Sequence, residues 1–72
     1  MKFLVIGLGS MGKRRIRNLL SLGQKNIIGY DVRDDRRKEV SEKYGIETFQ
    51  NFDEALSHKP DVFIISTPPD IH

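Results

Sequence analysis

The chain has 72 residues, no cysteine, and twelve basic against ten acidic residues, which gives a formal net charge of +2. This length leaves room for one small core, and the absence of cysteine excludes disulfides, thiolate metal sites and a cysteine nucleophile. Because the net charge is small and the apolar run at residues 3–6 is too short for a signal or membrane-spanning segment, we expect a cytoplasmic protein that binds neither nucleic acid nor membrane.

The first third of the chain predicts a strand followed by a helix. Residues 3–6 form an unbroken apolar run, which is typical of a strand covered on both faces in a parallel sheet. Between residues 10 and 22, four apolar residues fall at helical spacing and predict an amphipathic helix on that sheet. These four are Met11, Ile16, Leu19 and Leu20. Gly23 follows in position to cap the C-terminus of the helix.

The middle of the chain repeats this order of strand and helix. Residues 26–30 predict a second strand that ends at Asp31. Asp34 or Asp35 can then cap the N-terminus of a second, mostly polar helix, which stops at Gly45. Three residues of this part are expected in the core: Tyr30, Val40 and Tyr44.

The last third predicts two strands with a brief helix between them. Residues 46–49 alternate apolar and polar side chains, as in a short strand. Asn51 followed by Glu54 fits a capping box and predicts a helix over residues 52–56. Its core residues would be Ala55 and Leu56. Residues 61–66 then form a fourth strand, again apolar on both sides.

The regular alternation of strands and helices determines the predicted architecture. Connections between parallel strands are right-handed, so the chain should form an α/β fold with a parallel sheet of about four strands. We expect the strand order 3-2-1-4, with helices flanking the sheet, as in half of a Rossmann fold. The chain shows no internal repeat, low-complexity tract or linker that would indicate a second domain.

A glycine pattern, G-x-G-x-x-G, lies between the first predicted strand and the first predicted helix. It consists of Gly7, Leu8, Gly9, Ser10, Met11 and Gly12. In a dinucleotide-binding turn the first glycine permits the tight turn, the second admits a pyrophosphate, and the third lets helix and strand pack closely. The pattern alone is weak evidence, because glycines can serve packing only. Its position before a helix N-terminus favours binding of a diphosphate.

Asp31 supplies the second half of this dinucleotide signature. It ends the second strand, nineteen residues after Gly12, where a carboxylate can accept both ribose hydroxyls of an adenosine. A carboxylate there repels a 2′-phosphate, which favours NAD as the cofactor. Arg33 and Arg36 are close enough in sequence to soften that repulsion and admit NADP. Arg36 can also lay its guanidinium plane against the adenine, or simply be solvated.

The loop after the fourth strand predicts a further contact with the dinucleotide. Ser66, Thr67 and Pro68 follow this strand at the carboxyl edge of the sheet, next to the first strand. Ligands of open α/β sheets lie in the crevice outside this edge. The alternative is a plain exit turn, and His72 could equally be a surface residue. No catalytic residue and no metal ligand is predicted in these 72 residues.

Three stretches together resemble a known family. "FLVIGLGSMGKRRIRNL", Asp31 with Arg36 five residues later, and "DVFIISTPPDIH" are similar to the N-terminal part of the glucose-fructose oxidoreductase and inositol dehydrogenase (Gfo/Idh/MocA) family. The resemblance implies an NAD(P)-binding Rossmann domain followed by a C-terminal domain that binds a sugar, polyol or related substrate. It also implies that Gly7 to Gly12 hold the pyrophosphate, Asp31 the ribose and Arg36 the adenine side. Three further residues would contact the nicotinamide half: Thr67, Pro68 and His72.

The resemblance also defines what the 72 residues lack. Family members carry a Glu-Lys-Pro motif after the fifth strand and a further acid-base residue in the C-terminal domain, and neither is present. Position 15, often histidine in the family, is Arg15 here. We therefore expect residues 1–72 to be the N-terminal portion of a dinucleotide-binding domain, truncated before the substrate domain and catalytically incomplete.

These observations leave three functional alternatives. The first is the NAD(P)-binding portion of an oxidoreductase that transfers hydride between a nicotinamide and a hydroxyl or carbonyl group. The second is a non-catalytic dinucleotide-binding or sensing module, and the third is a fragment of an S-adenosylmethionine-dependent methyltransferase. The expected partners are the dinucleotide, a small-molecule substrate held by the absent domain, and further copies of the chain. Self-association of the fragment is expected through its exposed fourth strand, and homo-oligomerisation in the parent protein.

Overall fold

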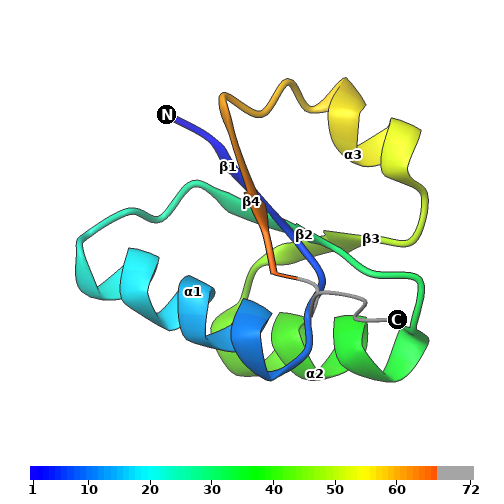
Figure 1. The fold of residues 1–72 in the computed structure, drawn as a ribbon, viewed down its shortest axis with the longest axis horizontal. Helices are drawn as coiled ribbons and strands as arrows, with labels where there is room; N and C mark the ends of the chain where they lie inside the picture. The colour runs from blue at the N-terminus through cyan, green and yellow to red at the C-terminus, as the bar shows by residue number, and fades with distance from the viewer. Residues whose placement is uncertain (67–72) are drawn as a thin grey trace, which may run out of the picture.

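The computed structural model describes residues 1–66 and shows strands and helices in strict alternation (Figure 1). In chain order these elements are β1 (Phe3–Ile6), α1 (Ser10–Ser21), β2 (Ile27–Tyr30), α2 (Asp34–Tyr44), β3 (Glu47–Phe49), α3 (Phe52–Ser57) and β4 (Val62–Ile65). All neighbouring strands run parallel, in the order β3-β2-β1-β4. The predicted α/β class, the strand order and the half-Rossmann architecture are therefore confirmed.

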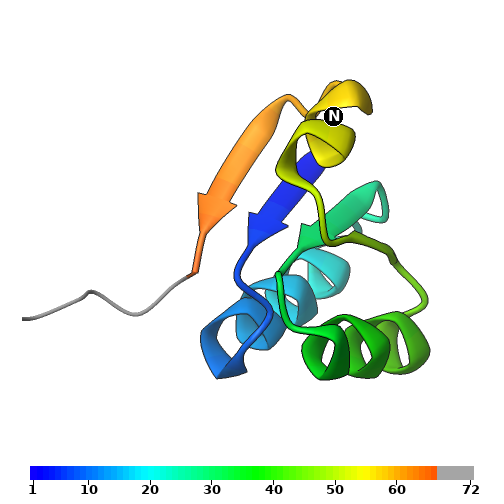
Figure 2. The same cartoon turned by 90° about the vertical axis from the view of Figure 1, so that its right-hand side faces the viewer.

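The sheet separates two small cores. Helices α1 and α2 cover one face, and α3 covers the other (Figure 2). Alternate residues of β1 point to opposite faces, so Val5 joins the core under α1 and α2 while Leu4 joins the core under α3. Neither side chain has any exposed surface. The apolar run of β1 thus forms a strand covered on both faces, as its sequence predicts.

Gly23 ends α1 as predicted, whereas the start of α2 differs from the sequence-based expectation. Helix α1 ends at Ser21, because Gly23 takes a left-handed conformation at φ +83° and its N–H donates to the carbonyl of Leu20. The N-cap of α2 is Arg33, and neither Asp34 nor Asp35 has this role. Both acids lie instead in the first turn of α2, where a carboxylate stabilises the positive end of the helix dipole.

Met11 does not join the core, contrary to its assignment to the apolar stripe of α1. Its side chain is 43% exposed. Gly12 and Ile16, one helical turn apart, occupy the face of α1 that contacts the sheet, and both are buried. Met11 is rotated away from this face by one residue, so its side chain reaches the carboxyl end of the sheet.

Strand β4 is covered unevenly. One edge pairs with β1, and among residues 1–66 no strand pairs with the other edge. Ile64 packs against the core under α1 and α2. Phe63 and Ile65 point to the opposite face, which α3 covers only over the other strands, and they are 48% and 69% exposed. The sequence correctly predicts an apolar strand here, and the described chain leaves half of it exposed.

We propose that two copies of the chain associate through β4, because its outer edge presents unpaired backbone groups beside exposed apolar side chains. Light scattering at micromolar concentration should then give a mass above that of the monomer. Ile65→Lys, which places a charge at this edge, should shift the protein toward monomer. Val32→Lys changes an equally exposed residue two strands away and should leave the mass unchanged. A monodisperse wild-type monomer would contradict the proposal.

Candidate dinucleotide site

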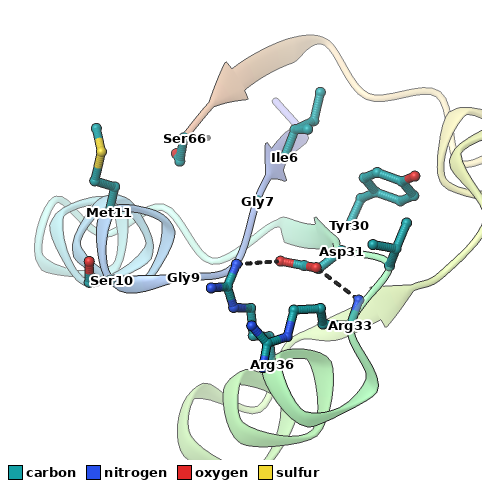
Figure 3. Close-up of a pocket in the computed structure, with 11 residues that line it drawn as sticks. Ile6, Gly7, Gly9, Ser10, Met11, Tyr30, Asp31, Arg33, Arg36 and Ser66 are labelled. Carbon is teal, nitrogen blue, oxygen red and sulfur yellow. Dashed lines mark hydrogen bonds and ion pairs between the residues drawn. The ribbon is translucent and has the colours of Figure 1, made fainter. Parts of the chain in front are cut away.

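A cavity of about 410 Å³ lies at the carboxyl end of the sheet, beyond the ends of β1, β2 and β4 (Figure 3). The residues predicted from the sequence that line it are Gly7, Gly9, Ser10, Met11, Asp31, Arg36 and Ser66. Leu8 and Gly12 are buried behind its wall. The topology therefore brings together residues from both ends of the described chain, as the rule for ligand sites in open α/β sheets predicts.

The glycine turn connects β1 to α1 along the floor of this cavity. Gly7 has φ +93°, a conformation that a residue with a side chain rarely adopts, and its N–H donates to the carbonyl of Tyr30 at 2.9 Å. Gly9 is the N-cap of α1 and provides no capping side chain, and the first turn contains no acidic residue. The positive end of α1 is thus open to an anion from the cavity side.

Gly12 lets α1 pack directly on the turn. A Cβ added to Gly12 would lie 1.9 Å from the carbonyl oxygen of Gly7 and 2.9 Å from its carbonyl carbon. Both atoms belong to the backbone, so a side chain at this position would force the turn and the helix apart. This close contact is the one that the third glycine of the pattern predicts.

Asp31 is the buried acid of the site, with 6% of its surface exposed. Its Oδ2 accepts the backbone N–H of Leu8 at 2.8 Å, and its Oδ1 accepts the N–H of Arg33 at 2.9 Å. The carboxylate therefore joins the glycine turn to the segment between β2 and α2. Each oxygen keeps one further lone pair, so Asp31 can still accept a hydroxyl from the cavity.

Two arginines line the cavity beside Asp31. The Arg36 Nη1 lies 3.7 Å from Asp31 Oδ2, and its guanidinium rests 3.4 Å from the position that a Cβ on Gly9 would occupy. Arg33 is turned toward Asp35 and forms two hydrogen bonds with its carboxylate, at 2.9 and 3.2 Å. These bonds lower the pKa of Asp35 below its ordinary value. Arg36 is therefore the arginine in direct contact with both halves of the predicted signature.

An ionic contact also joins helix α1 to helix α2 next to the cavity. Lys13 of α1 donates to Glu39 of α2, and this hydrogen bond lowers the pKa of Glu39. One turn farther from the cavity, Arg17 donates to the hydroxyl of Tyr44 at 3.4 Å. Part of the basic cluster of α1 is thus used in contacts between helices.

Ser66 closes the cavity on the side of β4. Its backbone N–H donates to the carbonyl of Ile6 at 2.8 Å, which continues the pairing of β1 and β4 by one residue. Its Oγ is buried and has no hydrogen-bond partner among residues 1–66. Thr67, Pro68 and His72, the other residues predicted at this end, lie outside the described residues.

Four further residues line the cavity: Ile6, Tyr30, Val32 and Arg33. Of these, the sequence indicated only Arg33, as a charge near the ribose. Tyr30, expected in the core, is half-buried and packs against the core under α3. Its ring lies edge to face with that of Phe52, with 5.3 Å between the ring centroids. The positions of the four residues in the sequence could have indicated that they line the cavity, because Ile6 directly precedes the glycine turn and the other three lie close to Asp31. Among residues 1–66 there is no helix long and apolar enough to cross a membrane, and no cluster of three potential metal ligands.

Comparison with known families identifies the family of the chain. The model of the Gfo/Idh/MocA oxidoreductase family, described as an NAD-binding Rossmann fold, matches residues 1–72. The chain belongs to this family. Its membership removes the support for the methyltransferase alternative. Searches of curated proteins and of solved structures found no match to the chain.

Replacing Gly12 by alanine tests the packing of the turn. Helix propensity alone would make Gly12→Ala stabilising by about 1 kcal/mol. The backbone contact with Gly7 predicts the opposite sign, a loss of about 3 kcal/mol in the free energy of unfolding. Urea denaturation followed by circular dichroism measures the difference. Arg14→Ala, at an exposed position of the same helix, is the control and should change stability little. A stabilised Gly12→Ala variant would refute the packing argument.

Proposed function

We propose that the chain binds NAD as the cofactor-binding portion of an oxidoreductase that acts on a hydroxyl or carbonyl group of a sugar, polyol or related compound. The observation that carries the proposal is the uncapped N-terminus of α1, which faces the same cavity as the buried carboxylate of Asp31. An adenosine diphosphate contains a diphosphate joined to a ribose. The N-terminus of α1 suits the diphosphate, and the carboxylate of Asp31 suits the ribose.

Three features of the chain fit such a cofactor. The contact of Gly12 with Gly7 keeps the N-terminus of α1 close to the end of β1, so a pyrophosphate can approach backbone N–H groups. Asp31 has free lone pairs for ribose hydroxyls, since the protein uses one on each oxygen. The buried Oγ of Ser66 has no partner among residues 1–66 and borders the cavity, so a polar group of the cofactor can satisfy it.

In this proposal the chain supplies recognition, and the bound nicotinamide supplies the capacity to accept or donate hydride. The turn binds the pyrophosphate, Asp31 orients the ribose, and Arg36 borders the adenosine side. Thr67, Pro68 and His72 would contact the nicotinamide half. We propose that a second domain supplies the groups for substrate binding and proton transfer and mediates homo-oligomerisation.

The choice between NAD and NADP depends on charge near the ribose. Asp31 is buried and held by two backbone N–H groups, so its carboxylate cannot turn away from a 2′-phosphate. Arg36 offsets part of this charge from 3.7 Å, whereas Arg33 is held by Asp35. The fixed carboxylate favours NAD, and Arg36 permits weaker binding of NADP.

Titration of the chain with NAD and with NADP tests this preference. We expect NAD to bind several-fold more tightly, because the 2′-phosphate of NADP adds repulsion with Asp31. Asp31→Asn removes the charge and keeps an acceptor oxygen, so it should narrow the difference. Calorimetry measures both dissociation constants. Tighter binding of NADP by the wild-type chain would contradict the assignment of Asp31.

The division of roles between domains has its own test. The pure 72-residue chain, mixed with NAD and a polyol such as inositol, should bind the cofactor and form no NADH, because no proton-transfer group is proposed in it. NADH absorbance measures turnover, and calorimetry in the same buffer verifies binding. Turnover that remains with the chain through purification would show that residues 1–72 contain a complete active site.

A further inference from the structure

Three consecutive residues of β2 and its end contact the glycine turn. The space above Gly29 receives the side chain of Leu8, the carbonyl of Tyr30 accepts the N–H of Gly7, and the carboxylate of Asp31 accepts the N–H of Leu8. The last two contacts are hydrogen bonds of 2.9 and 2.8 Å. The end of β2 therefore determines where the turn lies.

Gly29 differs from its neighbours in β2, which are large apolar residues that favour strands. Glycine in a strand interior destabilises the strand and indicates a close approach by other atoms. Here those atoms are the methyl carbons of Leu8, since a Cβ on Gly29 would lie 2.9 Å from Cδ2 and 3.2 Å from Cδ1. The next neighbour, Ile46 Cδ1, would be 3.6 Å away, which is an ordinary contact.

Leu8 cannot avoid a side chain at position 29 by turning into solvent. It is fully buried in the core that Val5, Ile16 and Val40 also form. A methyl group on Gly29 would consequently push Leu8 and its backbone away from β2. The N–H of Leu8 would move with it, away from Asp31 Oδ2.

We infer that Gly29 is a positioning residue for cofactor binding: it leaves the space that Leu8 fills, and so holds the glycine turn and the N-terminus of α1 at the distance from Asp31 that one dinucleotide spans. Gly29 itself does not line the cavity, so it acts on cofactor binding through Leu8. The inference therefore rests on the proposed function. It extends the site to a residue outside the glycine pattern.

The test compares three variants of the chain. Gly29→Ala adds the methyl group. Ile27→Ala, on the same face of β2 two residues farther from the turn, is the control, because it removes apolar atoms from the core that Leu8 shares and adds none beside Leu8. Gly29→Ala combined with Leu8→Val removes both methyl carbons that the new Cβ would meet. Two quantities are measured: the dissociation constant for NAD, corrected for the folded fraction, and the hydrogen-exchange rate of the Leu8 amide without NAD, relative to global unfolding.

Gly29→Ala should weaken NAD binding roughly tenfold, the value of one hydrogen bond to a charged group, and should accelerate exchange of the Leu8 amide. Ile27→Ala should keep the wild-type affinity for NAD and the wild-type exchange rate of the Leu8 amide. The double variant should recover both, and should fold even if Gly29→Ala does not.

Each contrary result identifies which proposal fails. Wild-type Leu8 protection in a folded Gly29→Ala variant would overturn the positioning role, as would an equal loss of affinity in Ile27→Ala or a double variant without recovery. Failure of the wild-type chain to bind NAD would instead overturn the proposed function, while the exchange measurement, made without cofactor, still decides whether Gly29 positions Leu8.

Discussion

The buried hydrogen bond between the N–H of Leu8 and the carboxylate of Asp31 is the contact on which the site depends. It joins residues that follow two adjacent strands, and it lies at 2.8 Å with almost no access to water. Hydrogen bonds to charged groups contribute about 1.5–3 kcal/mol, so this one is significant for a chain with so small a core. Both sides of the cavity are fixed relative to each other through it.

This arrangement gives Asp31 two roles that the sequence pattern does not separate. A buried carboxylate requires compensation, and Asp31 obtains it from two backbone N–H groups and from the nearby Arg36. The same bonds fix the direction of the remaining lone pairs. The acid is thus a structural link before any ligand arrives, and a ribose would meet an acceptor whose orientation is already set.

The sequence predicts the sheet well because its information is local. The apolar runs of β1 and β4, the turn glycines and Asn51 as the cap of α3 are all found in the structure. The start of α2 could not be assigned, because Asp31 Oδ1 accepts the N–H of Arg33 and this side-chain turn places Arg33 at the N-cap.

Contacts between distant segments explain the remaining differences. Helical periodicity places Met11 on the apolar face of α1 that should meet the core. The contact of Gly12 with Gly7 instead turns Met11 toward the cavity. A lone glycine within β2 indicates a close approach by other atoms, but only the structure shows that those atoms belong to Leu8. Family resemblance supplies the cofactor class, whereas these geometric details come from packing.

The position of β1 in the sheet also has consequences for how the chain folds. β1 is the first strand in the sequence, and it pairs with β2 on one edge and with β4, near the end of the described chain, on the other. Every strand pairing is parallel, so each pair of partners is joined by a crossover connection that contains at least one helix. β1 therefore precedes both of its partners in the chain, and during synthesis one of its edges stays open until β4 has been made.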